Sequence, residues 1–198
     1  MISDNWDQGE SGNKGLGGSG PSTRLSSYSG PGADGILYTA DDDIDGYFTF
    51  AYDVDGNLYR RVMYSSPGTD AIWFSSDDTP VGYGDVVSFN GDFFQRTVNY
   101  TDPGADATWL TNDDLIDSYT DYDYGINGFL LQSIGYNSAG LDGTWFTADD
   151  TPNGYEAYSY DANGDRLAMD ECQNPGPDAL WFTADDILED SEEYYTGF

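Results

Sequence analysis

The feature that most constrains this chain is an internal repeat with a constant interval of 36 residues. Five segments share, with substitutions, the pattern Pro-Gly-x-Asp-x-x-Trp-Phe-Thr-x-Asp-Asp, and their anchoring glycines are Gly32, Gly68, Gly104, Gly140 and Gly176. A short repeat cannot bury its apolar face alone, so neighbouring units must stack to make a continuous core. The interval therefore predicts an array of five small units.

Two further patterns within each unit predict β-structure. Alternating aromatic runs such as residues 46–52 and 154–160 precede turns that contain Asn or Asp and Gly, which is the usual sign of a β-hairpin. A tyrosine lies four residues before each of four anchoring glycines, and Cys172 occupies the fifth such position. We therefore predict three strands per unit: the Trp-Phe-Thr segment, the aromatic run and the segment returning to Pro-Gly. We expect Cys172 to act as a small apolar residue.

The predicted fold class is all-β, with five 36-residue repeats forming an elongated, stacked antiparallel sheet or β-solenoid-like array over residues 24–198. The units start near residues 31, 67, 103, 139 and 175, and residues 1–23 are expected to be a flexible lead segment rich in Gly and Ser. Residues 24–29 match the third strand type, and residues 187–198 match the second. The alternative is a closed five-unit ring or small propeller, but the unit is short for a four-stranded blade.

Composition argues against several functions. Lys and Arg together number 6 and Asp and Glu 37, so the formal net charge is -31, and the chain has no His. Such a chain lacks the basic surface that nucleic acids require, and an anionic membrane surface would repel it. No apolar run is long enough for membrane insertion. Ser-His-Asp catalysis, Cys-His catalysis and Cys/His zinc sites all need the missing histidine.

The acidic residues are mainly Asp, 31 against 6 Glu, and Asp favours turns and hard-cation loops. If equivalent carboxylates lay one strand apart, each pair would repel by about 4 kcal/mol. Few cationic side chains are present to offset this repulsion, so we predict that Ca²⁺ does. The predicted ligands are the three register acids of each unit: Asp34, Asp41, Asp42, Asp70, Asp77, Asp78, Asp106, Asp113, Asp114, Asp142, Asp149, Asp150, Asp178, Asp185 and Asp186.

The spacing leaves the geometry of such a site open. Asp34 and Asp41 would lie about 23 Å apart in an extended chain, so either the loop curls around one ion or neighbouring units share it. The segment Asp53-Val54-Asp55-Gly56-Asn57 is a weaker candidate, since it resembles the start of an EF-hand loop without the later Glu. The alternative to cation binding is a set of solvated acidic turns that serve solubility.

Residues 52–58, Tyr-Asp-Val-Asp-Gly-Asn-Leu, resemble the Y-D-x-x-G-x-L motif of YD repeats, also called RHS repeats. Residues 160–167 resemble the same motif with one extra residue. The resemblance covers about half of each unit. Members of this family build long spiralling β-sheets in secreted and cell-surface proteins, as shells around toxins or as adhesive modules. The resemblance implies a bacterial protein that is extracellular or on the cell surface, where weak Ca²⁺ sites would be filled.

These observations predict a non-enzymatic, extracellular structural or adhesive repeat module, stabilised by Ca²⁺ at the recurring Asp turns. Its candidate partners are divalent cations and a polysaccharide or other surface molecule. The alternative is a carbohydrate- or peptide-binding module that uses the repeated Trp and Phe side chains, although such rows more often belong to a core. A glycoside-active enzyme would need one asymmetric pair of carboxylates, and five near-identical sites argue against it.

Overall fold

In the computed structural model, residues 23–37, 39, 41–89 and 93–194 are described, and they form one ten-stranded sheet without helices. The strands are β1 (Arg24–Gly30), β2 (Asp43–Tyr52), β3 (Leu58–Tyr64), β4 (Pro80–Phe89), β5 (Phe93–Asp102), β6 (Leu115–Tyr124), β7 (Leu130–Tyr136), β8 (Pro152–Tyr160), β9 (Arg166–Asn174) and β10 (Ile187–Glu193). They lie in chain order, and each neighbouring pair is antiparallel. The described residues include no helix that could cross a membrane.

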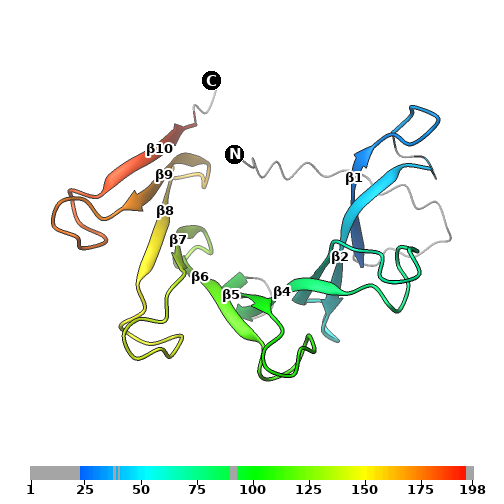
Figure 1. Cartoon of the computed structure of the whole chain (residues 1–198). Coiled ribbons are helices and arrows are strands. Elements are labelled where there is room, and N and C mark those ends of the chain that lie inside the picture. Colours follow the sequence, from blue (N-terminus) through cyan, green and yellow to red (C-terminus); the bar gives the residue numbers. More distant parts are fainter. Residues whose placement is uncertain (1–22, 38, 40, 90–92, 195–198) are drawn as a thin grey trace.

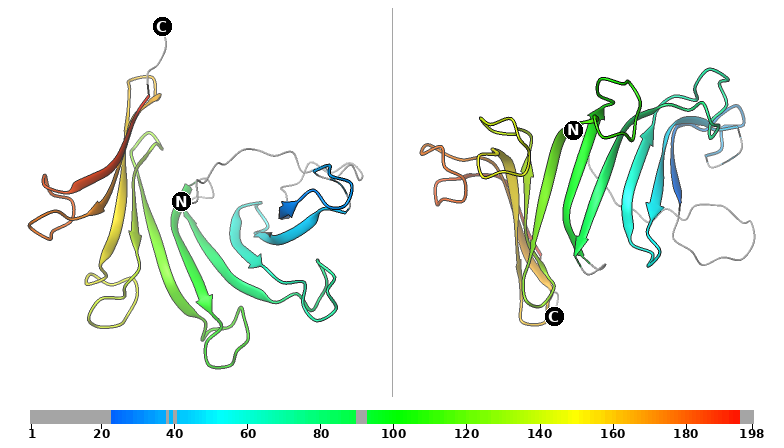
Figure 2. Two further views of the ribbon diagram at one scale, coloured as in Figure 1. Left: turned by 45° about the horizontal axis from the view of Figure 1, so that its top comes forward. Right: turned by 90° about the horizontal axis from the view of Figure 1, so that it is seen from below.

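The sheet is open and curves into an arc with β1 and β10 at its two edges (Figure 1). This confirms the all-β, stacked antiparallel sheet, and the closed ring is not formed. The long loops that carry the repeated motif lie at one end of the strands, and the short hairpins lie at the other (Figure 2). The predicted lead segment falls almost wholly outside the described residues.

Each unit contributes two strands, so the third strand predicted over Trp-Phe-Thr was wrong. Residues 73–76 lie in turns, and Phe74 has a left-handed φ of 68°. The β-propensity of Trp and Phe is outweighed here by backbone hydrogen bonds to nearby Asp side chains. The Trp-Phe segment therefore belongs to a loop that curls back over the sheet.

The hairpins follow the turn chemistry that the sequence predicted. In the β2–β3 hairpin the Asp53 amide donates to the Asn57 carbonyl at 2.9 Å, and Gly56 takes up a φ of 88°. The β6–β7 and β8–β9 hairpins repeat this pattern of hydrogen bonds. A left-handed residue is needed at this position, and Gly adopts it without the cost that a Cβ atom imposes.

The core lies on one face of the sheet, beneath the motif loops. Its most buried members are Tyr47, Val98, Tyr119 and Cys172, which are 5%, 5%, 3% and 2% exposed. Tyr119 stacks on Tyr136 across the β6–β7 pair with 4.4 Å between ring centroids, and other units repeat this tyrosine stack. In the fourth such pair Cys172 stands opposite Tyr155 in place of the second ring. The expected apolar role of Cys172 in a tyrosine position is confirmed.

The repeated Trp side chains close this core from the loop side. Trp145 meets the Tyr119 ring edge-on at 5.9 Å, and the other three repeated Trp make the equivalent contact. All four are half-buried. Their main role is therefore packing, as expected for a tyrosine and tryptophan row.

Candidate functional site

Each of the five motif loops curls so that its acidic residues meet within one unit. The loops span residues 31–42, 65–79, 103–114, 137–151 and 175–186. In the first loop the Asp34 amide donates to Asp41 Oδ2 at 3.0 Å, although seven residues separate the two. Of the two geometries that the sequence left open, the structure therefore has the curled loop.

The second register acid of each loop (Asp41, Asp77, Asp113, Asp149 and Asp185) closes the loop. Asp149 Oδ2 accepts hydrogen bonds from the amides of Leu141 and Asp142 at 2.7 and 3.1 Å. Its Oδ1 accepts from the Thr147 hydroxyl at 2.7 Å. The corresponding hydroxyl comes from Thr or Ser in the other loops. These carboxylates therefore bind donors from their own loop.

The first and third register acids hold the turns between them. In the fourth loop Asp142 Oδ1 accepts from the Thr144 amide at 2.6 Å. Asp150 Oδ2 accepts from the Phe146 amide at 2.7 Å, and Asp150 is only 7% exposed. Phe146 has a φ of 70°, which is a strained conformation for a residue with a side chain. The hydrogen bonds offset this strain, and the same left-handed position recurs in the second, third and fifth loops.

A hydrogen bond joins several units to the unit that follows, and we call it the tyrosine clasp. A buried tyrosine hydroxyl donates to the third register acid 31 residues later, as in Tyr119 to Asp150 Oδ2 at 2.7 Å. Three clasps are made, by Tyr47 with Asp78, Tyr119 with Asp150, and Tyr155 with Asp186. Tyr83 and Asp114 occupy the equivalent positions, and burial, followed by this carboxylate, raises the pKa of Tyr83. The tyrosine lies on the first strand of a hairpin, and the acid lies in the motif loop after the second strand. The hydrogen bond therefore fixes that first strand to the next unit's motif loop.

The contacts within the loops and the clasps shift the pKa values of the second register acids and of the clasp tyrosines. The Thr147 hydroxyl, followed by loop amides, lowers the pKa of Asp149, and the same causes act on its four equivalents. Burial, followed by the clasp to Asp150, raises the pKa of Tyr119 well above its usual value. The loops are therefore built around ionised second acids and neutral tyrosines.

The structure brings the predicted metal ligands together unequally. Among the described residues, the only three acids whose oxygens all lie within 4.8 Å of one another are Asp34, Asp41 and Asp42 of the first loop. The other predicted ligands share the loop positions but do not form so tight a group of three. Asp53, the weaker candidate, accepts hydrogen bonds from the amides of Asp55 and Asn57 and acts as a hairpin cap.

The repulsion argument for bridging cations assumed that equivalent loops lie one strand apart. Because each unit contributes two strands, equivalent loops follow every second strand, a spacing of about 9.5 Å. Repulsion between equivalent carboxylates is correspondingly weaker, and the loop amides and hydroxyls supply part of the stabilisation. Acidic rows can therefore exist in this fold without a cation between units.

The sequence analysis missed a row of ion pairs on the core face. Arg60 contacts Asp85 at 2.5 and 2.8 Å, and Arg96 contacts Asp121 at 2.5 and 2.7 Å. Each guanidinium also lies over a clasp tyrosine, with Arg96 4.7 Å from the Tyr119 centroid. The spacing of 36 residues between these arginines was the signal that could have revealed the row.

Comparison with models of known protein families gave no match, and comparison with curated proteins gave none either. Among solved structures, the chain is similar to a protein of unknown function from Bacteroides fragilis NCTC 9343, with 16% identity and a TM-score of 0.48. That match covers 74% of this chain and 91% of the other. A DUF3836 family protein from Bacteroides vulgatus ATCC 8482 matches with 10% identity and a TM-score of 0.37, over 55% of this chain and 90% of the other.

Proposed function

We propose that this chain is a non-enzymatic structural repeat module of an extracellular or cell-surface protein, with a role in adhesion. The observation that carries the proposal is the tyrosine clasp, made three times between successive units. Stability in such an array comes from contacts between neighbours, and uniform contacts suit an element that must stay rigid along its length. An enzyme would instead need a pair of carboxylates whose environments drive their pKa values apart for acid and base roles, whereas the second acid of every loop is held by the same kind of hydroxyl donor.

The experiment for this proposal replaces the third register acid of each loop by Asn, one loop at a time. We expect comparable losses in the free energy of unfolding at the three interior loops, where the clasp acid is most buried: Asp78, Asp114 and Asp150. The readout is denaturant unfolding followed by Trp fluorescence. A single loop whose variant abolishes hydrolysis of a model glycoside, with stability unchanged, would favour an enzyme and refute the proposal.

Calcium at the recurring Asp turns stays a prediction. Because protein donors engage the carboxylates, we expect the second to fifth loops to fold without an ion. In the first loop Asp34, Asp41 and Asp42 offer three oxygens within 4.8 Å of one another, and Ca²⁺ prefers carboxylate oxygens. We therefore expect a calcium effect to depend mainly on this loop.

Thermal unfolding with Ca²⁺, with Mg²⁺, and with a chelator in high NaCl tests this expectation. Asp34→Asn should remove a Ca²⁺-dependent rise in midpoint, whereas the matched variant Asp142→Asn in the fourth loop should keep it. An equal rise in NaCl would mean that salt only screens the charge of -31. No rise in any condition would eliminate Ca²⁺ and leave the structural proposal unaffected.

The predicted alternative, a carbohydrate- or peptide-binding module on the repeated Trp side chains, is less favoured at that position. Each of these side chains is half-buried and edge-on to a clasp tyrosine. A ligand that stacks on aromatic rings needs an accessible ring face. A site for such a ligand is therefore to be sought elsewhere on the sheet.

A further inference from the structure

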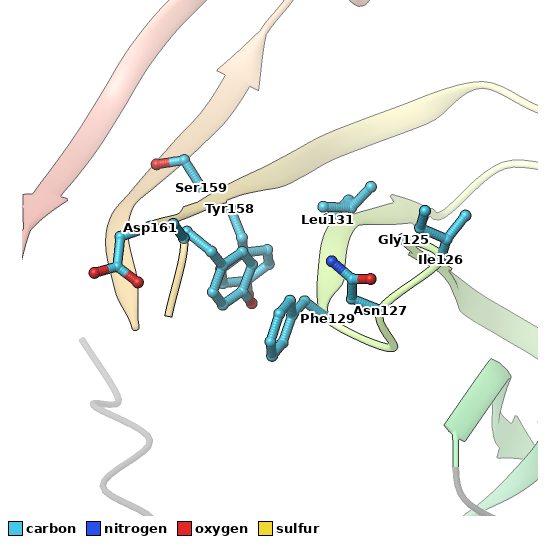
Figure 3. A pocket seen from close by; sticks show the side chains of 10 residues that line it. Gly125, Ile126, Asn127, Phe129, Leu131, Tyr158, Ser159 and Asp161 are labelled. Carbon is cyan, nitrogen blue, oxygen red and sulfur yellow. The ribbon is translucent and has the colours of Figure 1, made fainter. Parts of the chain in front are cut away.

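A groove of about 320 Å³ lies on the sheet between the β6–β7 hairpin and the end of β8 (Figure 3). Its size is at the small end of the range for ligand sites, which is about 300–1,000 Å³. Tyr158 and Leu131 reach it from the face opposite the core, because they alternate with the paired residues Ala157 and Gln132. None of the register acids of the motif loops lines it.

The aromatic walls of the groove are held in place by internal hydrogen bonds. The Tyr160 hydroxyl donates to the Leu130 carbonyl at 2.9 Å, and Phe129 stacks on Tyr160 with 4.9 Å between centroids. The Tyr158 hydroxyl donates to Glu156, which also accepts from the Ser133 hydroxyl at 2.9 Å. Both phenol oxygens are thus engaged within the protein. Rings fixed before binding reduce the entropy cost of ordering them on a ligand.

One polar group of the groove is available to a ligand. The Asn127 side chain is exposed and lies close to Phe129 in Figure 3, and its amide has no hydrogen-bond partner among the described residues. It can donate and accept at once. The Asp161 carboxylate, in contrast, already accepts from the amides of Asn163 and Asp165 at 2.8 and 2.9 Å.

This chemistry selects a neutral, amphipathic ligand. No Lys or Arg is among the lining residues, although the Arg166 guanidinium lies 5.9 Å from the Tyr158 ring centroid, and the net charge of -31 disfavours anions. The lining residues include one carboxylate, that of Asp161, which offers a cationic peptide a single charge. We propose that the groove binds a sugar ring of a neutral polysaccharide. The apolar face of the ring stacks on Tyr158 or Phe129, and its hydroxyls bond to the Asn127 amide.

The repeat extends this surface beyond one sugar ring. The positions equivalent to Tyr158 at intervals of 36 residues lie on β2, β4, β6 and β8 and directly after β10, about 9.5 Å apart. Four of the five are aromatic: Phe50, Tyr122, Tyr158 and Tyr194, with Val86 as the exception. A row of this kind across the strands matches a polymer better than a free monosaccharide. The inference rests on the adhesive part of the proposed function and gives it a ligand class.

Native affinity electrophoresis in gels containing hydroxyethylcellulose, galactomannan or dextran tests the inference. We expect at least one of these neutral polymers to retard the chain. Tyr158→Ala should weaken that binding about tenfold, which is about 1.4 kcal/mol. Asn127→Ala, on an exposed hairpin residue, should weaken it several-fold without loss of folding. The matched control is Phe182→Ala, which removes an exposed ring of the fifth motif loop, outside the groove and outside this row.

Several results would overturn the inference. These are the absence of retardation by all three polymers, retardation that Asn127→Ala and Tyr158→Ala leave unchanged, and retardation only by cationic polylysine. Unfolding midpoints of each variant separate loss of binding from loss of fold. Failure here is distinguishable from failure of the structural proposal, because the Asp→Asn unfolding series involves no sugar.

Discussion

The tyrosine clasp gives the sharpest test of how the units are joined, and Tyr119→Phe is the variant of choice. Tyr119 is 3% exposed and Asp150 is 7% exposed, and the hydroxyl lies 2.7 Å from Asp150 Oδ2. Phe keeps the ring and its stack on Tyr136 but leaves a largely buried carboxylate with one donor fewer. Hydrogen bonds to charged groups contribute about 1.5–3 kcal/mol, so we expect the free energy of unfolding to fall by that amount.

Urea unfolding monitored by Trp fluorescence measures this loss, because Trp145 contacts the Tyr119 ring. The matched control is Tyr136→Phe, which alters the other ring of the same stack. Its hydroxyl makes no hydrogen bond within the described part of the chain, so its loss should stay within about 0.5 kcal/mol. Equal losses in the two variants would refute the clasp as the source of stability, as would a Tyr119→Phe protein as stable as the parent.

Three further predictions concern the loops, the ion pairs and pH. Gly104→Ala should cost at least about 2 kcal/mol in thermal unfolding, since φ is 67° and a Cβ atom would lie 2.1 Å from the Asp113 carbonyl oxygen. Gly143→Ala, with a similar φ and open space, should cost only about 1 kcal/mol. Arg96→Ala should cost about 1–2 kcal/mol by urea unfolding, through loss of the Asp121 pair and the ring contact, and an unchanged midpoint would contradict this. The pKa of the second register acids is lowered in the folded protein. Their contribution to the free energy of unfolding is therefore present above the pKa of Asp in the unfolded chain, about 3.9, and is lost as pH falls below it. The pKa of the clasp tyrosine Tyr119 is raised in the folded protein. Its contribution to the free energy of unfolding is therefore lost as pH rises above the pKa of Tyr in the unfolded chain, about 10. A scan of unfolding midpoint against pH checks both, and a midpoint that rises steadily toward pH 2 would contradict the first.

The parts of the fold that the sequence could predict are those set by local pattern. Period-two alternation and Gly-containing turns gave the hairpins, because strand pairing and turn geometry depend on residues close in sequence. Tyr recurs every 36 residues in the strand before each Pro-Gly, and Cys172 takes the last of these positions. This recurrence predicted that Cys172 packs where the other units have a tyrosine. The open sheet followed from a unit too short for a propeller blade.

The parts that could not be predicted depend on contacts between side chain and backbone. Trp73 and Phe74 have the composition of a strand, but the Asp70 and Asp78 side chains bind the amides of Ile72 and Phe74 and turn the chain. Period and propensity carry no information on such hydrogen bonds. The sequence argument for cations also left these hydrogen bonds out. It compared the number of acidic side chains with the number of basic ones, and that comparison does not include the loop amides and hydroxyls that bind the carboxylates.

The first loop differs from the others in its register and in how its acids gather. A clasp joins residues 31 apart, and the sequence has Ser11, not a tyrosine, 31 residues before Asp42. In this loop the oxygens of Asp34, Asp41 and Asp42 lie within 4.8 Å of one another. At the other end Ser191 occupies the tyrosine position of β10. The clasps thus join strands of the first, third and fourth units to the motif loop of the unit that follows, and the first motif loop has the carboxylate geometry most suited to a cation.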